Sequence, residues 1–341
     1  MTKGCIALND GGIEFFKEPF ILKPIGKSML WGGSRLNDDY SKGLDLYPLA
    51  ETWECSTHKE GISEIATGSF KGWQLDRFIK EYPQVLGEHN KLLMDIPVIV
   101  KLIDANKDLS IQVHPSDDYA RNKEAEPYGK TEMWYVLDSQ KDSSLVYGFH
   151  NGVTKEQVEK SIQNNTICSL VHRVDVHPND VFLIEPGTVH AICSGVLVAE
   201  IQQKSNLTYR LYDYDRIDKD GKKRELHIKK ALDVININYN NKPSQPMRIL
   251  KYSPGSAIEV LYRCEYFQVE RILVNTDRQR NLVEYGADNL SFRILLCIDG
   301  ACTLFWKNNA QPVFKGDCLF IPADSCRIKI HGKAKFLDVS C

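Results

Sequence analysis

Short apolar runs separated by turn residues dominate the chain and predict a protein built mainly of β strands. Residues 97–103, 133–137 and 181–184 are largely apolar runs of strand length, and 196–200 is a fourth run that ends in a glutamate. Around Trp53, polar and apolar residues alternate, as they do in a strand with one buried face.

Three stretches depart from this pattern and favour helices. Apolar residues recur at near-helical spacing on both sides of Pro83, so we expect a small helical insertion near 72–95. Residues 154–162 form a second candidate helix, which opens with the T-x-x-Q spacing of a capping box. Residues 225–235 form the third.

A change in composition divides the chain into two parts. Residues 236–246 are rich in Asn, Lys, Ser and Pro and predict a linker. Beyond it, 248–341 consists almost entirely of short strands and turns, which is typical of a β barrel or sandwich. A length of 341 residues suits one large or two ordinary domains. We therefore expect a mainly β fold with domains at 1–240 and 241–341.

Charge and composition exclude several kinds of partner. The formal net charge is −2, whereas a nucleic-acid or anionic-membrane partner favours a basic surface. No apolar run approaches the roughly 20 residues that span a bilayer. The first twelve residues lack the apolar core of a signal peptide. The ten cysteines include no C-x-x-C pair. Together these features predict a cytoplasmic protein with reduced, mostly buried thiols.

Polar residues at the ends of apolar strands point to a metal site. Gln112 and His114 alternate with apolar residues, so both side chains should leave the same strand face. Glu132 directly precedes the apolar run 133–137. A carboxylate at this position contributes little to hydrophobic packing but is a good metal ligand. His190 follows the next apolar run. Such oxygen and nitrogen ligands suit zinc or a similar divalent ion, with room left for water or substrate.

These residues belong to motifs that resemble one enzyme family. The segments LSIQVHP, GKTEMWYVL and PGTVHAI carry the four candidate ligands, and WGG, AETWE and NLTYR accompany them in order over residues 20–216. As a set they resemble the mannose-6-phosphate isomerases (phosphomannose isomerases) of the cupin-fold type, in their short bacterial form. The resemblance implies two cupin-like β-barrel (jelly-roll) domains. It also implies one zinc ion per chain, held by Gln112, His114, Glu132 and His190.

The resemblance also implies an activity and its catalytic residues. The family interconverts mannose 6-phosphate and fructose 6-phosphate, a small sugar phosphate pair, through a cis-enediol. Arg210 of NLTYR matches the family's catalytic arginine, and a permanent positive charge suits it to stabilise a developing oxyanion. Glu200 is our candidate base, because it lies where the family carries a site glutamate. Lys130 matches a lysine associated with activity.

Two further residues are expected to contact the substrate, and one position departs from the family. Lys101 matches a second family lysine that could bind phosphate or move protons, and the Ser110 hydroxyl could donate to phosphate. Long-form relatives carry Asp where this chain has Asn206. An amide cannot act as acid or base, so this substitution leaves the proton-transfer group open.

An internal repeat suggests that the C-terminal domain lacks the metal site. Residues 179–186 resemble 316–322, and 133–138 resemble 294–299. Aligned in this way, Arg293 stands opposite Glu132 and Cys326 opposite His190. We therefore expect 241–341 to be a cupin-like β domain without metal ligands.

Two alternatives stay open from the sequence. The first is a different sugar or sugar-phosphate isomerase on the same scaffold, because the metal set discriminates poorly among 2-hydroxy aldehydes. The second is a catalytically silent cupin that binds a sugar. The presence of Arg210, Lys101 and Lys130 argues against the second. Either a monomer or a homodimer is compatible with the sequence.

Overall fold

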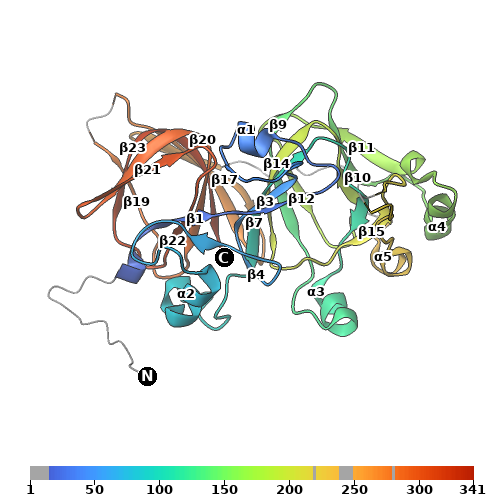
Figure 1. Cartoon of the computed structure of the whole chain (residues 1–341), viewed down its shortest axis with the longest axis horizontal. Helices are drawn as coiled ribbons and strands as arrows, with labels where there is room; N and C mark the ends of the chain where they lie inside the picture. Colours follow the sequence, from blue (N-terminus) through green and yellow to red (C-terminus); the bar gives the residue numbers. More distant parts are fainter. Residues whose placement is uncertain (1–14, 218–219, 238–248, 279–280) are drawn as a thin grey trace.

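Three antiparallel sheets stacked face to face make up most of the protein. The computed structural model describes residues 15–217, 220–237, 249–278 and 281–341. Figure 1 shows the C-terminal strands at one end of the molecule, and β10, β15, α4 and α5 at the other. The structure confirms the prediction of a mainly β chain, and a cupin fold fits this arrangement.

Two of the sheets face each other as a sandwich in the N-terminal part. We call them the central sheet and the outer sheet, and both are antiparallel throughout the described residues. The central sheet has the order β12 (Val181–Ile184), β9 (Glu132–Ser139), β14 (Val196–Gln203), β7 (Val98–Ala105), β3 (Glu51–Cys55), β2 (Ile25–Lys27). The outer sheet has the order β11 (Val171–Asp175), β10 (Ser144–Phe149), β13 (His190–Ile192), β8 (Ile111–Val113), β15 (Tyr209–Tyr212).

The third, C-terminal sheet takes its strands from both ends of the chain. Its order is β16 (Ile249–Ser253), β17 (Ser256–Arg263), β18 (Gln268–Asn275), β23 (Ile328–Ser340), β20 (Arg293–Trp306), β22 (Cys318–Ile321), β1 (Phe20–Lys23), β6 (Glu64–Ile65), with β19 (Val283–Tyr285) on β23 and β21 (Asn309–Phe314) on β20. A small hairpin joins β4 (Thr57–His58) to β5 (Gly61–Ile62).

The expected division at residue 240 stays a prediction. Strand β1 pairs with β22, so a segment near the N-terminus belongs to the C-terminal sheet and precedes the strands of the sandwich in the sequence. Most of the expected linker, residues 238–246, lies outside the described residues, as does the N-terminal stretch examined for a signal peptide.

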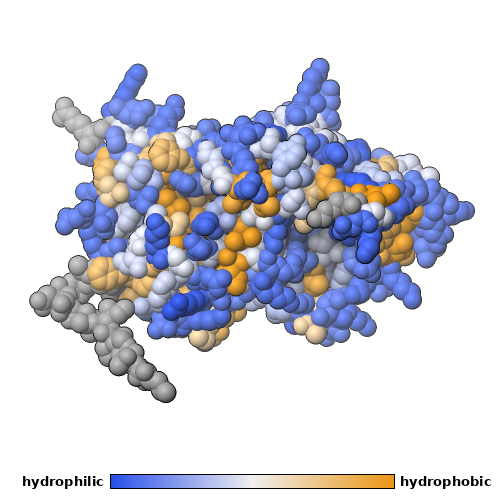
Figure 2. All heavy atoms as spheres, in the orientation of Figure 1, coloured by the Kyte–Doolittle hydropathy of each residue, from blue (hydrophilic) through white to orange (hydrophobic). Residues whose placement is uncertain are grey.

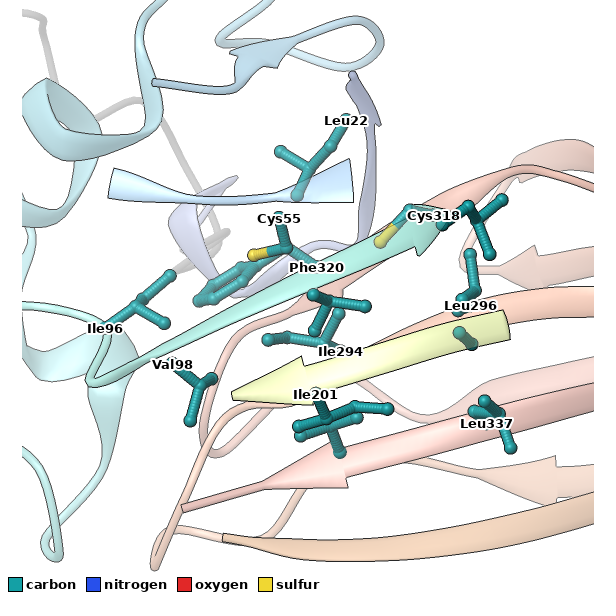
Figure 3. Close-up of a cluster of buried hydrophobic side chains, with 14 of the residues drawn as sticks. Leu22, Cys55, Ile96, Val98, Ile201, Ile294, Leu296, Cys318, Phe320 and Leu337 are labelled. Carbon is teal, nitrogen blue, oxygen red and sulfur yellow. The ribbon is translucent and has the colours of Figure 1, made fainter. Parts of the chain in front are cut away.

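The central sheet is buried on both faces, which explains its continuous apolar runs. Every residue of β7 and β14 is buried. Alternate side chains pack toward the outer sheet, and those between them pack toward the C-terminal sheet. Figure 3 shows the second contact, where Val98 and Ile201 of the central sheet meet Ile294 and Leu337 of the C-terminal sheet. This shared core joins the two parts.

Helices cover the edges and the outer face of this stack. They are α1 (Arg35–Asp38), α2 (Leu75–Glu81), α3 (Asp117–Tyr119), α4 (Lys155–Gln163) and α5 (Ile228–Val234), with 3₁₀ turns at Phe15–Lys17, Pro83–Leu86 and Ile167–Ser169 and a π turn at Ala120–Glu124. The helical insertion is found as α2 and the turn after it. The capping box of α4 is formed by Thr154 and Gln157.

One helix is shorter than its periodicity predicts. The apolar spacing predicts a helix from 225, but α5 begins at Ile228. The preceding residues bond to the edge strand β15 instead: His227 N donates to Arg210 O at 2.8 Å, and Arg210 N donates to His227 Nδ1 at 3.2 Å. A tertiary contact therefore overrides local helix preference at this point.

Figure 2 shows mostly hydrophilic residues around the periphery of this face of the molecule and patches of hydrophobic residues over its middle. None of the helices in the described part of the chain has the length and apolarity needed to cross a lipid bilayer.

Candidate metal centre and active site

The side chains predicted as metal ligands meet between the central and outer sheets. On β8, Ile111 and Val113 pack outward, so Gln112 and the following His114 point inward. His190 opens β13 directly opposite Gln112. Glu132 opens β9 on the facing central sheet. Strand alternation and strand pairing therefore bring residues from three separate motifs to one place.

Three of these side chains form a closely spaced and fully buried set. Glu132 lies between the two imidazoles: its Oε2 is 3.5 Å from His114 Nε2, and its Oε1 is 3.4 Å from His190 Nε2. The three candidate ligand atoms all lie within 4.8 Å of one another, and each residue is 0% exposed. This spacing lets one divalent ion contact all three residues.

Several polar atoms of this set lack hydrogen bonds. Both ring nitrogens of His114 and both carboxylate oxygens of Glu132 are buried without a hydrogen-bond partner in the described structure. Leaving a buried polar group unsatisfied costs about 1–3 kcal/mol, and more for a charged group. A bound cation would satisfy His114 Nε2 and Glu132 together, so the donor set fits a metal ion.

Local structure orients His190 for the same purpose. Its Nδ1 lies 2.8 Å from Thr188 O, which places the proton on Nδ1 and leaves Nε2, 3.4 Å from Glu132 Oε1, unprotonated with its lone pair. Gly187 makes the preceding turn with a φ of +87°, a conformation that favours glycine. Its amide donates to His114 O at 2.9 Å, so the turn also ties the two histidine segments together.

Burial favours the protonation states that a metal requires. It lowers the pKa of His114 to about 3, with Lys130 adding to the effect, and it also lowers the pKa of His190. Burial alone would raise the pKa of Glu132, but Lys130 and the two histidines hold it well below the usual value. At neutral pH the set is therefore two neutral imidazoles and a carboxylate, all able to donate lone pairs.

Gln112 lies beside this set, but its role as a ligand stays a prediction. Its Nε2 donates to His190 Nε2 at 3.3 Å, and its Oε1 accepts from Ser110 Oγ at 3.5 Å. A rotation of the Gln112 side-chain amide by about 180° would exchange its Nε2 and Oε1, and Oε1 would then face an ion between His190 and Glu132.

Lys130 lies beside Glu132 of the metal set, and Arg210 lies beside Gln112 on the neighbouring strand of the outer sheet. Lys130 Nζ is 3.0 Å from Glu132 Oε2 and only 4% of the residue is exposed. Arg210 lies on β15 opposite Gln112, half-buried at the edge of the outer sheet. Its Nε donates to Ser110 Oγ at 3.4 Å, and its Nη1 donates to Glu225 O at 2.7 Å. Burial lowers the pKa of Arg210, and nearby Arg224 lowers it further.

Lys101 and Glu200 form a buried ion pair on the central sheet. They lie opposite each other on β7 and β14, and Lys101 Nζ is 3.0 Å from Glu200 Oε1. Trp134 Nε1 donates to the other oxygen of Glu200 at 3.0 Å. Burial and the charge of Glu132 raise the pKa of Glu200. Burial lowers the pKa of Lys101, but Glu200 and Glu51 outweigh it and raise the pKa overall.

Two residues of this neighbourhood were not singled out by the sequence. Trp134 holds Glu200, and Glu51 lies 3.9 Å from Lys101 Nζ while it accepts from Trp53 Nε1 at 3.0 Å. A sequence signal existed for Trp134, which is two residues after Glu132 and so on the same strand face. Glu51 lies in the AETWE motif, but nothing in that motif indicates a lysine partner.

The C-terminal sheet repeats the strand pairing around the metal site. Arg293 opens β20 and pairs with Ile321 of β22, as Glu132 opens β9 and pairs with Ile184 of β12. This register agrees with the alignment that set Arg293 opposite Glu132. Cys326 lies in the turn after β22 and is partly buried. Within the described residues, His114, Glu132 and His190 are the group that could hold a metal.

If Cys326 has no ligand role, Cys326→Ser should leave turnover and zinc content near the wild-type values. The change is nearly isosteric and lies in the C-terminal part of the chain. Metal analysis of both proteins, together with steady-state kinetics, would check this. A second ion that disappears with the substitution would contradict the absence of a metal site in this part.

Comparisons with known proteins agree on one family. Two family models match: "Phosphomannose isomerase type I, catalytic domain" over residues 20–146 and "Mannose-6-phosphate isomerase, cupin domain" over residues 257–340. Mannose-6-phosphate isomerase ManA of Bacillus subtilis (strain 168) is 36% identical over 329 residues, which covers 93% of this chain and 97% of that protein.

Solved structures extend this agreement to the fold. The crystal structure of the mannose 6-phosphate isomerase from Bacillus subtilis gives a TM-score of 0.86 at 32% identity, and the match covers 95% of this chain and 99% of that one. A zinc-bound mannose 6-phosphate isomerase gives a TM-score of 0.73 at 16% identity, covering 94% and 99%, which is a likeness of fold.

Proposed function

The chain belongs to the mannose-6-phosphate isomerase family, and on that premise we propose that its buried histidine–glutamate–histidine set is the zinc site of an aldose–ketose isomerase. The enzyme interconverts mannose 6-phosphate and fructose 6-phosphate. The observation that carries the proposal is the full burial of His114, Glu132 and His190 around a point where the ring nitrogens of His114 and the carboxylate oxygens of Glu132 have no hydrogen-bond partner in the described structure.

The reaction needs a base, an oxyanion partner and a way to hold the sugar. A base removes the proton on C2 of the aldose and a proton is delivered to C1, while the hydroxyl proton moves from O2 to O1. The intermediate between these steps is a cis-enediol. The zinc ion, held by His114, Glu132, His190 and in our proposal Gln112, supplies Lewis-acid stabilisation of negative charge on oxygen.

Arg210 is proposed to face the developing oxyanion. Its two hydrogen bonds, to Ser110 Oγ and Glu225 O, hold the guanidinium over the inner face of the outer sheet. An arginine stays charged even with its pKa lowered, so it is a fixed electrostatic partner rather than a base. Ser110 is proposed to donate a hydrogen bond from its hydroxyl to the substrate.

Glu200 is proposed as the base, with the Lys101 ammonium as its charge partner. The raised pKa of the Glu200 carboxyl makes it a stronger base than an exposed glutamate. Lys101 Nζ donates to the Glu200 carboxylate at hydrogen-bond distance, so its ammonium orients the base and balances its negative charge before a proton is taken up. Asn206, where long-form relatives have Asp, instead donates Nδ2 to Glu60 Oε2 at 2.7 Å on the exposed surface.

Replacing Lys130 with methionine should lower kcat/KM by about 10–100-fold, the usual cost of losing a partner of a metal ligand. The ammonium lies 3.0 Å from Glu132, so it is within reach of substrate oxygens beside that carboxylate. Zinc content should stay near the wild-type value, because Glu132 and both histidines remain. Lys123→Met, at an exposed position, is the matched control. Unchanged kinetics in Lys130→Met would remove this residue from the catalytic set.

We further propose that the enzyme works in the cytoplasm as a monomer or homodimer on a free sugar phosphate, without a nucleic-acid or membrane partner. The near-neutral net charge of −2 supports the last part.

The test of the function is a coupled assay that follows fructose 6-phosphate formation from mannose 6-phosphate. Turnover with this substrate, and much slower turnover with glucose 6-phosphate and unphosphorylated mannose, is the expected result. Comparable rates on another aldose would favour a different sugar isomerase on this scaffold. Binding without turnover by zinc-loaded protein would indicate a non-catalytic sugar-binding cupin.

A further inference from the structure

A cavity of about 540 Å³ opens among the strands of the C-terminal sheet, away from the metal set. Strands β17, β18, β19, β20 and β23 surround it. Its lining includes Arg293, Glu270 and Asp338, together with the phenol of Tyr285. Charged residues in such a position are unusual for a purely structural core, in which apolar side chains are expected.

The charged residues occupy strand positions that match the catalytic positions of the sandwich. Asp338 of β23 pairs with Leu295, two residues into β20. Glu200 of β14 pairs in the same way two residues into β9. Glu270 of β18 lies opposite Asp338, as Lys101 of β7 lies opposite Glu200. The second part of the chain thus keeps the pocket positions but carries different charges on them.

The hydrogen-bonding capacity of this cluster is not used up within the protein. Asp338 is 2% exposed, and its Oδ1 has no hydrogen-bond partner in the described structure, whereas its Oδ2 accepts from Tyr285 OH at 3.0 Å. Arg293 Nη1 is 3.7 Å from Asp338 Oδ2 and 3.8 Å from Glu270 Oε2, within ion-pair range but beyond hydrogen-bond distance. A buried carboxylate oxygen and a guanidinium therefore both face the cavity with unused bonding sites.

Charge balance selects the kind of ligand. The cavity lining contains two arginines and four carboxylates, namely Arg293, Arg327, Glu270, Glu284, Asp288 and Asp338. The excess of carboxylates disfavours a phosphate or another anion. Arg293 lies between the two innermost carboxylates and so disfavours a metal cation. What remains is a neutral molecule that both donates and accepts hydrogen bonds.

A sugar has this combination of properties. Its hydroxyls can donate to Asp338 and Glu270 and accept from Arg293. The apolar lining residues Ile258 and Ile272 offer contact to the C–H face of a sugar ring. We propose that this cavity is a second binding site, for a neutral monosaccharide of hexose size.

The first experiment uses the wild-type, zinc-loaded protein and unphosphorylated mannose as the probe. Crystals soaked in mannose should show a sugar beside Arg293 and Asp338. Density only beside His114 and Glu132, or no bound sugar, would overturn the proposal. A parallel soak in inorganic phosphate should leave the cavity free of phosphate, and phosphate at Arg293 would show that the charge argument is wrong.

The second experiment measures mannose affinity in solution by calorimetry on variants. Arg293→Ala should weaken mannose binding at least about tenfold, since it removes a hydrogen bond between the sugar and a charged group. His190→Ala, which empties the metal site, should leave this binding in place. Lys329→Ala, an exposed change on the same β23 strand, is the matched control. Equal affinity in Arg293→Ala and wild type would refute the site, and the soaked wild-type crystals decide the matter if the variant does not fold.

Discussion

His190→Ala is expected to abolish isomerase activity and to remove most of the bound zinc, which in the wild type should be about one ion per chain. His190 is one of the three buried candidate ligands, and its loss leaves Glu132 and His114 with the proposed amide ligand Gln112. Lewis-acid stabilisation by a metal is worth several kcal/mol, so we expect activity to fall at least about a thousandfold. Metal analysis and the coupled assay measure the two effects.

The controls for this prediction separate metal loss from unfolding. Circular dichroism should show the strand content of the wild type, because the core clusters do not depend on His190. His177→Ala removes an exposed histidine and should change neither zinc content nor rate. Chelation of the wild type should abolish activity, and added zinc should restore it. Full activity in metal-free protein would exclude the proposed role of this set.

Arg210→Ala should lower kcat at least about a hundredfold while KM and bound zinc change little. A residue that only held the substrate's phosphate would act equally on the ground and transition states, so its loss would raise KM alone. An arginine facing the oxyanion acts mainly in the transition state. Removing one such donor typically costs about 10²–10³ in kcat, or roughly 2.7–4 kcal/mol. Steady-state kinetics with mannose 6-phosphate provides the measurement.

Two variants sharpen the interpretation. Arg210→Lys should recover little of the lost kcat. The ammonium of a flexible lysine side chain cannot reproduce a planar guanidinium that donates to both Ser110 and Glu225. Arg173→Ala removes an exposed arginine from β11 of the same outer sheet and should leave kcat unchanged. A rise in KM with intact kcat in Arg210→Ala would show a phosphate clamp instead.

The metal set was predictable because its information is local. Strand alternation places Gln112 and His114 on one face, and each of Glu132 and His190 stands at the start of a strand within its own motif. Burial of the surrounding apolar runs then follows from their length and composition. The helical insertion and the capping box of α4 are local features of the same kind, and both are present in the structure.

Partnerships between distant residues were not predictable in this way. The Lys101–Glu200 ion pair joins residues 99 positions apart, and the bond from Trp134 to Glu200 spans 66. Each depends on which strand lies beside β14 and in which register. A shift of one residue would turn Lys101 to the opposite face of the sheet.

The sequence by itself determined the β character of the chain and the residues that could bind a metal, because periodicity and strand alternation depend only on residues near one another along the chain. The family followed from the resemblance of a set of motifs spread over residues 20–216. Only the tertiary structure decided that β1 joins the C-terminal sheet, that α5 starts at Ile228, and that Arg293, Glu270 and Asp338 share a cavity. These outcomes depend on long-range strand pairing, in which the burial of whole sheets selects one register among many that local patterns allow.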